Sequence, residues 1–305
     1  LPICLYNYFE YIMEDDLNEK TISPSEHPLQ LARTEIPEKA VERIGFYLTS
    51  VRLIARRTAE MHVFLASGKE EPRFAPESFS KLYQRALYQS MRANAVQVLP
   101  QLKKKANRLP ESMRTDAVRI SEHQNQILDS FRALLEQKIT GKRLRCHGDF
   151  HLGQVLYTGK DFVIIDFEGE PSRPISERRI KRSPLKDVAG MLRSFHYAAY
   201  SAIAEEQVRG LVHSLNKEVM EQFAEYWYSW VCAAFLKEYF EHAKPGKFLP
   251  QSDKEIRILL DSFLMEKAVY EIDYEMNNRP DWLGIPLKGI HSLLEQAGKL
   301  ESDET

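Results

Sequence analysis

The sequence predicts a mainly α-helical protein with a small β-hairpin at its centre. Long segments carry apolar residues at spacings of three and four, which is the period of an α-helix. Residues 155–165 instead predict two short strands around a Gly-Lys turn. With 305 residues, of which 43% are hydrophobic, the chain can bury a sizeable core as one large domain or two closely packed subdomains.

The first long helix is expected from Pro37 to Ala66. Pro37 suits the first helical turn, because an N–H group at that point would have no partner inside the helix. The positions at helical spacing form one amphipathic stripe, which predicts the side that faces the core. This stripe consists of Ile44, Tyr47, Leu48, Val51, Ile54, Ala55, Thr58 and His62.

Two charge-rich helices follow at about 78–106 and 112–138, separated by a Leu-Pro pair, and we expect them to form an antiparallel hairpin beside the core. Three further long helices are predicted at residues 185–205, 216–239 and 253–277. The last of these should end before Arg279-Pro280, because a residue that precedes proline is disfavoured in the αR conformation.

Residues 146–168, CHGDFHLGQVLYTGKDFVIIDFE, carry the chemistry of the chain. Asp149 follows a His-Gly pair, Gln154 begins the first strand, and the second strand leads directly into Asp166. A turn at residues 158–161 would bring Gln154 and Asp166 alongside each other, with Asp149 near both.

These residue types suit the transfer of a phosphoryl group. An attacking hydroxyl needs a carboxylate that orients it and accepts its proton, while oxygen ligands hold Mg²⁺ on the phosphates of ATP. We therefore expect Asp149 to be the catalytic base, and Gln154 and Asp166 to be the metal ligands.

The loop resembles the catalytic loop of eukaryotic-type kinases, in the HGDxxxxN form of the aminoglycoside phosphotransferases, except that Gln154 replaces the usual Asn. It resembles the maltokinases more closely, including those fused to trehalose synthase, because these enzymes use Gln at this position. The similarity continues through IDFEGEPSRPISERRIKRSPLKDVAGMLRSF and, at residues 267–290, through KAVYEIDYEMNNRPDWLGIPLKGI. Together with the intervening helical segments, these blocks cover most of residues 40–295.

The resemblance implies the C-terminal lobe of a protein-kinase-like fold, with a hinge remnant at residues 1–36 and the lobe itself at 37–300. Within the lobe it implies a helical subdomain at about 78–138, the catalytic hairpin at 144–168 and acceptor-site helices at 185–290. The implied reaction transfers the γ-phosphoryl group of ATP to the anomeric hydroxyl of maltose. The product is maltose 1-phosphate, on the route from trehalose to α-glucans such as glycogen, and a trehalose synthase domain is the implied partner.

The nucleotide-clamping N-terminal lobe is expected to be missing. The chain has only 13 glycines and no GxGxxG or GxxxxGK[ST] element, and no strand-rich block with a Val-Ala-Ile-Lys-like element precedes the first long helix. We therefore expect the isolated chain to have little or no kinase activity. The alternative function is a non-catalytic module that binds a disaccharide or docks on trehalose synthase.

The sugar is expected to bind on the last long helix and around the metal ligands. The candidate residues are Lys267, Tyr270, Glu271, Tyr274, Arg279 and Trp282 on or just after that helix, and His151, Glu168 and Arg173 beside the metal ligands. His151 would face the acceptor or merely pack, and Glu168 and Arg173 would touch the substrate or hold the loop. The first four candidates recur at i, i+3, i+4 and i+7, so they share one helix face. That face would bind the acceptor, or it would be a surface stripe whose long side chains extend into solvent.

Other polar residues of this region are expected to hold the loop in place. His147 would do so by hydrogen bonds, as the equivalent His does in the resembled kinases. Asp187 would accept backbone hydrogen bonds from the loop, or would simply be favoured at a helix start by the helix dipole. The basic run at residues 178–182 would steer phosphates, or would be an ordinary solvated surface.

Two other kinds of chemistry are disfavoured. Cys146, His147 and His151 could meet a zinc ion, but no nearby CxxC or HxxxH motif supplies the further ligand that a closed site needs. The tetrapeptide at residues 148–151 resembles the Gly-Asp-x-His opening of dinuclear metallophosphoesterases. The later ligand loops and the β-sandwich pattern of those hydrolases are not found in this helical sequence.

Composition predicts the surroundings of the protein. The net charge of −2 gives no reason to expect nucleic acid as a partner. No apolar run approaches the roughly 20 residues that span a bilayer, so no membrane is expected. The three cysteines are too few and too scattered for a disulfide framework, which favours the reducing cytoplasm.

Overall fold

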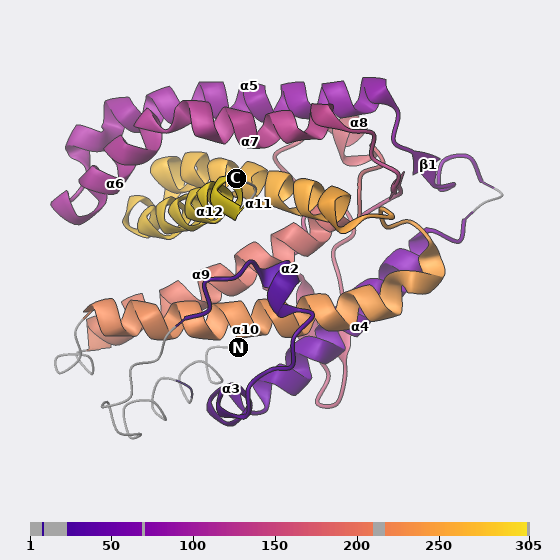
Figure 1. The fold of residues 1–305 in the computed structure, drawn as a ribbon, viewed down its shortest axis with the longest axis horizontal. Helices are drawn as coiled ribbons and strands as arrows, with labels where there is room; N and C mark the ends of the chain where they lie inside the picture. Colours follow the sequence, from indigo (N-terminus) through magenta and orange to yellow (C-terminus); the bar gives the residue numbers. More distant parts are fainter. Residues whose placement is uncertain (1–7, 9–22, 69–70, 210–216, 304–305) are drawn as a thin grey trace. The chain divides into compact units, whose positions relative to one another are not determined.

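The computed structural model describes residue 8 and residues 23–68, 71–209 and 217–303, and this part of the chain is mostly helical (Figure 1). The mainly α-helical fold class is therefore confirmed. The chain divides into two compact units, each assembled from three segments that alternate along the sequence. Unit 1 comprises Leu1–Phe64, His151–Phe167 and Ser194–Lys247, and unit 2 comprises Leu65–Phe150, Glu168–Arg193 and Phe248–Thr305.

Unit 1 is built around helix α10. Its elements are α2 (Pro28–Leu31), α3 (Glu38–Ile44), α4 (Tyr47–Leu65), a single 3-10 turn η2 (Leu152–Gln154), strands β3 (Val155–Tyr157) and β4 (Phe162–Ile164), the later part of α9 (Leu185–Arg209), α10 (Lys217–Ala243) and η3 (Lys244–Gly246). Both α2 and α3 pack on α10. Tyr47 of α4 also stacks on Trp227 of α10, with 5.1 Å between the ring centroids. Most of the predicted segment 1–36 lies outside the described residues.

The predicted single helix from Pro37 to Ala66 is wrong, since the chain forms α3 and α4 with a break at Gly45. Gly45 has φ 60° and ψ −139°, a conformation that is open essentially to glycine alone. Pro37 precedes the first turn as the N-cap residue of α3 rather than standing inside it. The predicted buried stripe is nevertheless confirmed, because all eight of its residues are buried.

The predicted β-hairpin is confirmed. Strands β3 and β4 are antiparallel, with Leu156 opposite Val163, and the N–H of Thr158 donates to the carbonyl of Asp161 at 2.8 Å to close the turn. Arg57 of α4 donates two hydrogen bonds to the Asp161 carboxylate, at 2.9 Å and 2.8 Å. The tip of the hairpin is therefore anchored to α4.

Unit 2 is built around helix α11, which packs against α5, α7 and α12 (Figure 1). Its elements are β1 (Glu77–Ser78), α5 (Lys81–Lys105), η1 (Ala106–Arg108), α6 (Glu111–Glu122), α7 (Gln124–Glu136), β2 (Lys142–Arg143), α8 (Ile175–Arg178), the first turns of α9, α11 (Asp253–Asn278), η4 (Pro280–Trp282) and α12 (Gly284–Asp303). Helix α11 ends before Arg279-Pro280, as predicted. The three helices α5 to α7, predicted as a subdomain, share this unit with α11 and α12.

The predicted single helix at 112–138 is also wrong. The chain turns at His123, with φ −84° and ψ 17°, and forms α6 and α7. This turn allows α6 to pack on α12 while α7 packs on α11, so tertiary contacts override a sequence that has no glycine or proline at the break. The antiparallel pair β1 and β2 was not predicted, because strands of two residues are too short to show an alternating pattern.

Among the described residues, none of the helices is both long enough and apolar enough to cross a membrane.

The break at Gly45 gives a first prediction. The Gly45→Ala substitution should lower the free energy of unfolding by about 1–3 kcal/mol, because alanine cannot adopt this backbone conformation without strain. The added Cβ has room, with its nearest neighbour, the Glu42 carbonyl, 3.9 Å away, so strain alone is tested. Urea unfolding followed by circular dichroism measures the change.

Gly298→Ala is the matched control, since Gly298 lies in α12 with an ordinary φ and open space around it. This substitution should leave stability unchanged or raise it slightly, because alanine favours helix over glycine. Equal unfolding midpoints for both variants would contradict the assigned strain at Gly45.

Candidate functional site

The loop that carries Asp149 is held by the buried carboxylate of Asp187. Asp187 lies in the first turn of α9 and is 1% exposed. Its Oδ2 accepts the N–H of His147 at 2.7 Å, and its Oδ1 accepts the N–H of Gly148 at 3.0 Å. His147 is also buried, and its Nδ1 accepts the N–H of Asp149 at 3.4 Å. Asp187 and His147 thus both bond to the loop backbone, as the sequence predicts for these two residues.

A pocket that is open to solvent lies beside this loop. All the residues that line it belong to unit 2. Its polar lining consists of Asn94, Asp149, Glu170, Arg173, Lys186, Asp187, Glu266, Lys267 and Tyr270, and Phe150 and Phe263 contribute aromatic surface. The predicted base therefore lies in the same pocket as three of the predicted sugar-binding residues, Arg173, Lys267 and Tyr270.

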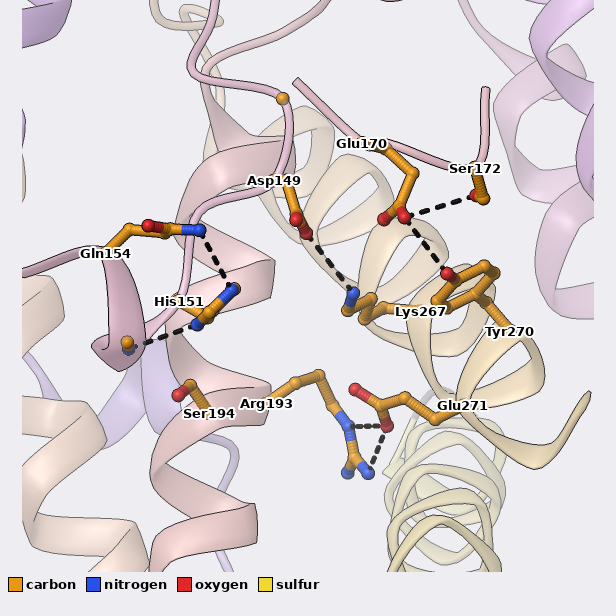
Figure 2. Close-up of polar contacts among 12 residues, drawn as sticks. Asp149, His151, Gln154, Glu170, Ser172, Arg193, Ser194, Lys267, Tyr270 and Glu271 are labelled. Carbon is orange, nitrogen blue, oxygen red and sulfur yellow. Dashed lines mark hydrogen bonds and ion pairs between the residues drawn. The ribbon is translucent and has the colours of Figure 1, made fainter. Parts of the chain in front are cut away.

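Lys267 stands between the polar groups of the pocket (Figure 2). Its Nζ lies 4.0 Å from Oδ1 of Asp149 and 4.8 Å from the centre of the Tyr270 ring. The hydroxyl groups of Tyr270 and Ser172 each donate to Oε1 of Glu170 at 3.1 Å. Burial raises the pKa of the Glu170 carboxyl, but the Lys267 charge and the two hydroxyl groups outweigh it and hold that pKa below its ordinary value. Glu170 is therefore ionised and hydrogen-bonded.

A second set of charges forms the buried side of the pocket. Nζ of Lys186 lies 2.7 Å from Oε2 of Glu266, and the guanidinium of Arg173 lies 3.8 Å from Oε1 of the same carboxylate. Burial raises the pKa of Glu266, but the charges of Lys186 and Arg173 outweigh it and lower the pKa below its ordinary value. Glu266 is therefore a paired carboxylate, as a buried charge has to be.

Glu271, a predicted sugar-binding residue, belongs to another buried ion pair. The Nε and Nη2 atoms of Arg193 donate to its Oε2 at 2.9 Å and 2.7 Å (Figure 2). The two side chains are only 3% and 9% exposed. Helix α12 passes so close that a Cβ atom on Gly289 would collide with the Arg193 guanidinium. This pair therefore joins α9, α11 and α12, and Glu271 does not line the pocket.

The remaining predicted residues of the last helix form a separate stack. The Arg279 guanidinium lies over the rings of Tyr274 at 5.3 Å and Trp282 at 4.9 Å, and it pairs with Glu275 at 2.8 Å. Tyr274 is 43% exposed. None of these residues lines the pocket, so only the earlier part of the predicted face, Lys267 and Tyr270, does so.

The two predicted metal ligands meet in unit 1. Nε2 of Gln154 donates to Oδ2 of Asp166 at 2.9 Å, so the hairpin brings them alongside each other as expected. Asp166 is exposed and has φ 62°, an uncommon conformation that often marks functional positions. An amide and a carboxylate offer the oxygen ligands that Mg²⁺ prefers, and Mg²⁺ commonly takes its other ligands from phosphates and water. The donor set therefore fits this ion.

His151 lies on the same side of unit 1 as Gln154, with its Nδ1 accepting the N–H of Gly153 at 3.0 Å and its Nε2 3.5 Å from the Gln154 amide (Figure 2). Glu168 is exposed at the start of the next segment of unit 2. Asp149 belongs to unit 2, whereas Gln154 and Asp166 belong to unit 1. Its approach to Gln154 and Asp166 stays a prediction.

The zinc hypothesis finds no support. Among the described residues, no group of three or more His, Cys, Asp or Glu side chains is arranged to hold a metal ion. The Cys146 thiol instead faces the backbone carbonyls of Leu144 and Arg182, at 3.5 Å and 3.4 Å.

The basic run is partly structural, because Lys181 is buried and its Nζ donates to the carbonyls of Pro72 and Ala75 and to Glu77. Arg178 donates to the carbonyls of Arg173 and Pro171. The Lys181 contacts attach the segment that follows the predicted metal ligands to residues 72–77 of unit 2.

Sequence reasoning missed four polar residues of the pocket: Asn94, Glu170, Lys186 and Glu266. Three of them are close neighbours in sequence of residues that were identified. Glu170 follows Glu168 by two positions, Lys186 precedes Asp187, and Glu266 precedes Lys267. Asn94, on α5, carries no sequence signal, because it stands alone in a charge-rich helix.

Comparisons with known proteins agree on the kind of fold. Residues 42–169 match the model of the phosphotransferase enzyme family. The glucosamine kinase of Mycolicibacterium smegmatis is 26% identical over 152 residues, which are 49% of this chain and 34% of that protein. The glucosamine kinase of Streptacidiphilus jiangxiensis is 37% identical over 51 residues, 17% of this chain and 12% of that protein.

Among solved structures, a glucosamine kinase in complex with glucosamine, ADP and inorganic phosphate matches with a TM-score of 0.66 at 18% identity, covering 90% of this chain and 57% of that chain. A further crystal form of glucosamine kinase gives the same TM-score and covers 59% of that chain. The chain thus spans less than two thirds of these relatives. The likeness shows that this chain shares the fold of these glucosamine kinase structures.

The contacts of Asp187 give a second prediction. Asp187→Ala should lower the free energy of unfolding by about 1–3 kcal/mol for each backbone N–H that it leaves without an acceptor. Hydrogen exchange should accelerate at the amides of His147 and Gly148 in particular, because these are the two donors. Urea unfolding and exchange monitored by mass spectrometry measure the two effects.

Asp281→Ala is the control, because Asp281 is exposed and a surface substitution of this kind stays within about 0.5 kcal/mol. If Asp187→Ala were no less stable than Asp281→Ala, and exchange at the loop amides were unchanged, Asp187 would not hold the loop.

Proposed function

We propose that this chain is the acceptor-binding and metal-binding part of an ATP-dependent kinase that phosphorylates maltose at the anomeric hydroxyl, giving maltose 1-phosphate. The observation that carries the proposal is the pocket in which Asp149, Lys267, Tyr270 and Glu170 surround one space. Such a lining of carboxylates, an ammonium group and a phenol suits a ligand with many hydroxyl groups. The choice of maltose rests on the resemblance of residues 267–290 to the last block of the maltokinases.

In this proposal Asp149 is the catalytic base. Its side chain is 17% exposed and lines the pocket, so a sugar hydroxyl can donate to it. The carboxylate orients this hydroxyl toward the γ-phosphoryl group of ATP and accepts its proton as the new bond to phosphorus forms. Tyr270 and Lys267 position the sugar from α11, and Glu170 keeps the Tyr270 hydroxyl oriented.

Gln154 and Asp166 are the proposed ligands of Mg²⁺. When bound, Mg²⁺ supplies positive charge that neutralises the phosphate oxygens of ATP. The Arg57–Asp161 contact holds the hairpin between these two ligands against α4, which limits their motion. We propose in addition that a nucleotide-clamping lobe of the parent protein completes the ATP site, and that a trehalose synthase domain accompanies it. ATP as the phosphoryl donor agrees with the ADP held by the solved relative.

A second candidate acceptor is glucosamine, and the names of the relatives favour it. The relatives are 18% to 37% identical to this chain over the matched parts. At such distances the acceptor often changes while the fold is kept, so the function has to be argued from the site. A module that binds a disaccharide without catalysis remains the alternative to both kinases.

A third prediction tests the reaction. In a coupled assay of ADP release, the parent protein should turn over with maltose and not with glucosamine, and the isolated chain should show little or no turnover. In the parent protein, Asp149→Asn should abolish turnover while ATP binding persists, because the base is removed and the metal ligands stay. Asp166→Ala should weaken ATP binding in the presence of Mg²⁺ and abolish turnover.

Asp281→Asn is the control for Asp149→Asn, since it makes the same change at an exposed position outside the pocket. Turnover with glucosamine alone would establish the second candidate. Unchanged activity of Asp149→Asn would exclude Asp149 as the base, whichever sugar reacts.

A fourth prediction concerns the acceptor site and compares two tyrosines on one helix. Tyr270→Ala should weaken the binding of maltose by about 1–3 kcal/mol, the value of one good pocket contact, because Tyr270 lines the pocket. Tyr274→Ala should leave binding unchanged, since Tyr274 stacks with Arg279 outside it. Calorimetric titration with maltose measures both, and thermal melting checks folding. The reverse order of effects would move the sugar to the Tyr274 side of α11.

A further inference from the structure

The carboxylates of the pocket are all engaged by groups of the protein itself. Asp187 accepts two backbone N–H groups. Glu266 is paired with Lys186 and Arg173. Glu170 accepts hydrogen bonds from two hydroxyl groups, and Asp149 faces Lys267. A cationic ligand therefore meets no carboxylate that lacks a partner in this pocket.

Lys267 is the cation of the pocket that faces Asp149, whereas Arg173, which is equally exposed, faces Glu266. Lys186 already donates to Glu266 at 2.7 Å, and the side chain of Lys186 is 19% exposed. Lys267 is 30% exposed, and its distance of 4.0 Å from Asp149 is longer than a hydrogen bond. Its ammonium group can thus donate hydrogen bonds to a ligand that lies between Asp149 and Tyr270.

A ligand hydroxyl group and a ligand ammonium group would interact differently with the ammonium group of Lys267. Lysine has three donors and no acceptor, so its ammonium group can bond to a ligand hydroxyl, which both donates and accepts. A ligand ammonium group is also a donor only. It would repel Lys267 in a partly buried site, where charges are weakly screened.

Resting on the proposed function, we infer that Lys267 makes this pocket selective for neutral polyhydroxyl acceptors and excludes amino sugars. Lys267 is thereby a specificity-determining residue. It neutralises the carboxylates of Asp149 and Glu170 that would otherwise attract a cationic sugar, and it donates to a sugar hydroxyl. A chain with this fold that lacked a cation at position 267 would instead present two carboxylates to the acceptor.

The test compares two ligands of the same shape. The first is maltose, and the second is the maltose analogue with an amine in place of the hydroxyl next to the anomeric carbon, at a pH at which the amine is protonated. Calorimetric titration of the unaltered chain should show the amine analogue binding at least about tenfold more weakly, a difference of about 1.4 kcal/mol. Lys267→Met should abolish or reverse this preference, because methionine keeps the contact with the Tyr270 ring and removes the charge.

Two control variants isolate the charge. Lys267→Arg keeps a cation at the same position and should keep the preference for maltose. Lys254→Met makes the same change at an exposed residue on the same helix, outside the pocket, and should leave both affinities unchanged. Thermal melting of every variant confirms that it is folded.

The outcomes separate this inference from the proposed function. If the chain binds maltose but Lys267→Met leaves the ratio of the two affinities unchanged, the inference is wrong and the proposed acceptor stands. Equal or tighter binding of the amine analogue by the unaltered chain also overturns the inference. If the chain binds neither sugar, the proposed acceptor site is wrong, and the inference falls with it.

Discussion

The carboxylate of Asp187 is buried and accepts hydrogen bonds from two backbone N–H groups in place of water. The geometry of the pocket depends on these two hydrogen bonds. A buried carboxylate is stable only when its oxygens accept hydrogen bonds. The donors within reach are the amides of His147 and Gly148, so the loop is fixed at the point where Asp149 follows. The position of the proposed base relative to α9 is thus set by a residue whose two carboxylate oxygens both bond to the loop backbone.

The same helix fixes the opposite wall of the pocket. Lys186 and Arg193 of α9 pair with Glu266 and Glu271 of α11, and these two pairs lie on either side of Lys267 and Tyr270 in the sequence. Buried ion pairs contribute little net stability, because desolvation offsets their attraction. Their unequal spacing, seven residues on one helix and five on the other, nevertheless favours a single axial register of α11. We infer that these pairs fix the position of α11 along α9 rather than stabilise the fold.

Features set by residues close together in the sequence were predicted, whereas features set by contacts between distant helices were not. The hairpin, the buried stripe of α4 and the end of α11 follow from local patterns and were predicted correctly. The breaks at Gly45 and His123 were missed. Apolar spacing continues across Gly45, from Ile44 to Tyr47, and the turn at His123 depends on which helices α6 and α7 meet.

The candidate site shows the same limit. The shared helix face of Lys267, Tyr270, Glu271 and Tyr274 was predicted from spacing, yet its members have different surroundings. Partners outside the helix distinguish them: Arg193 of α9 pairs with Glu271 in the interior, while Arg279, just beyond the end of α11, lies over the Tyr274 ring outside the pocket. No periodicity within one helix contains that information.

The anchoring of the hairpin by Arg57 differs from the pairs of the pocket in one respect, its access to salt. Arg57 and Asp161 are 31% and 39% exposed, whereas Lys186 and Glu266 of the pocket are 19% and 8% exposed. Dissolved ions screen exposed charges over about 8 Å at physiological ionic strength, and screen buried ones much less. Rising ionic strength is therefore expected to weaken the Arg57–Asp161 contact that anchors the hairpin more than the Lys186–Glu266 pair, so the hairpin and the pocket respond unequally to the solution around them.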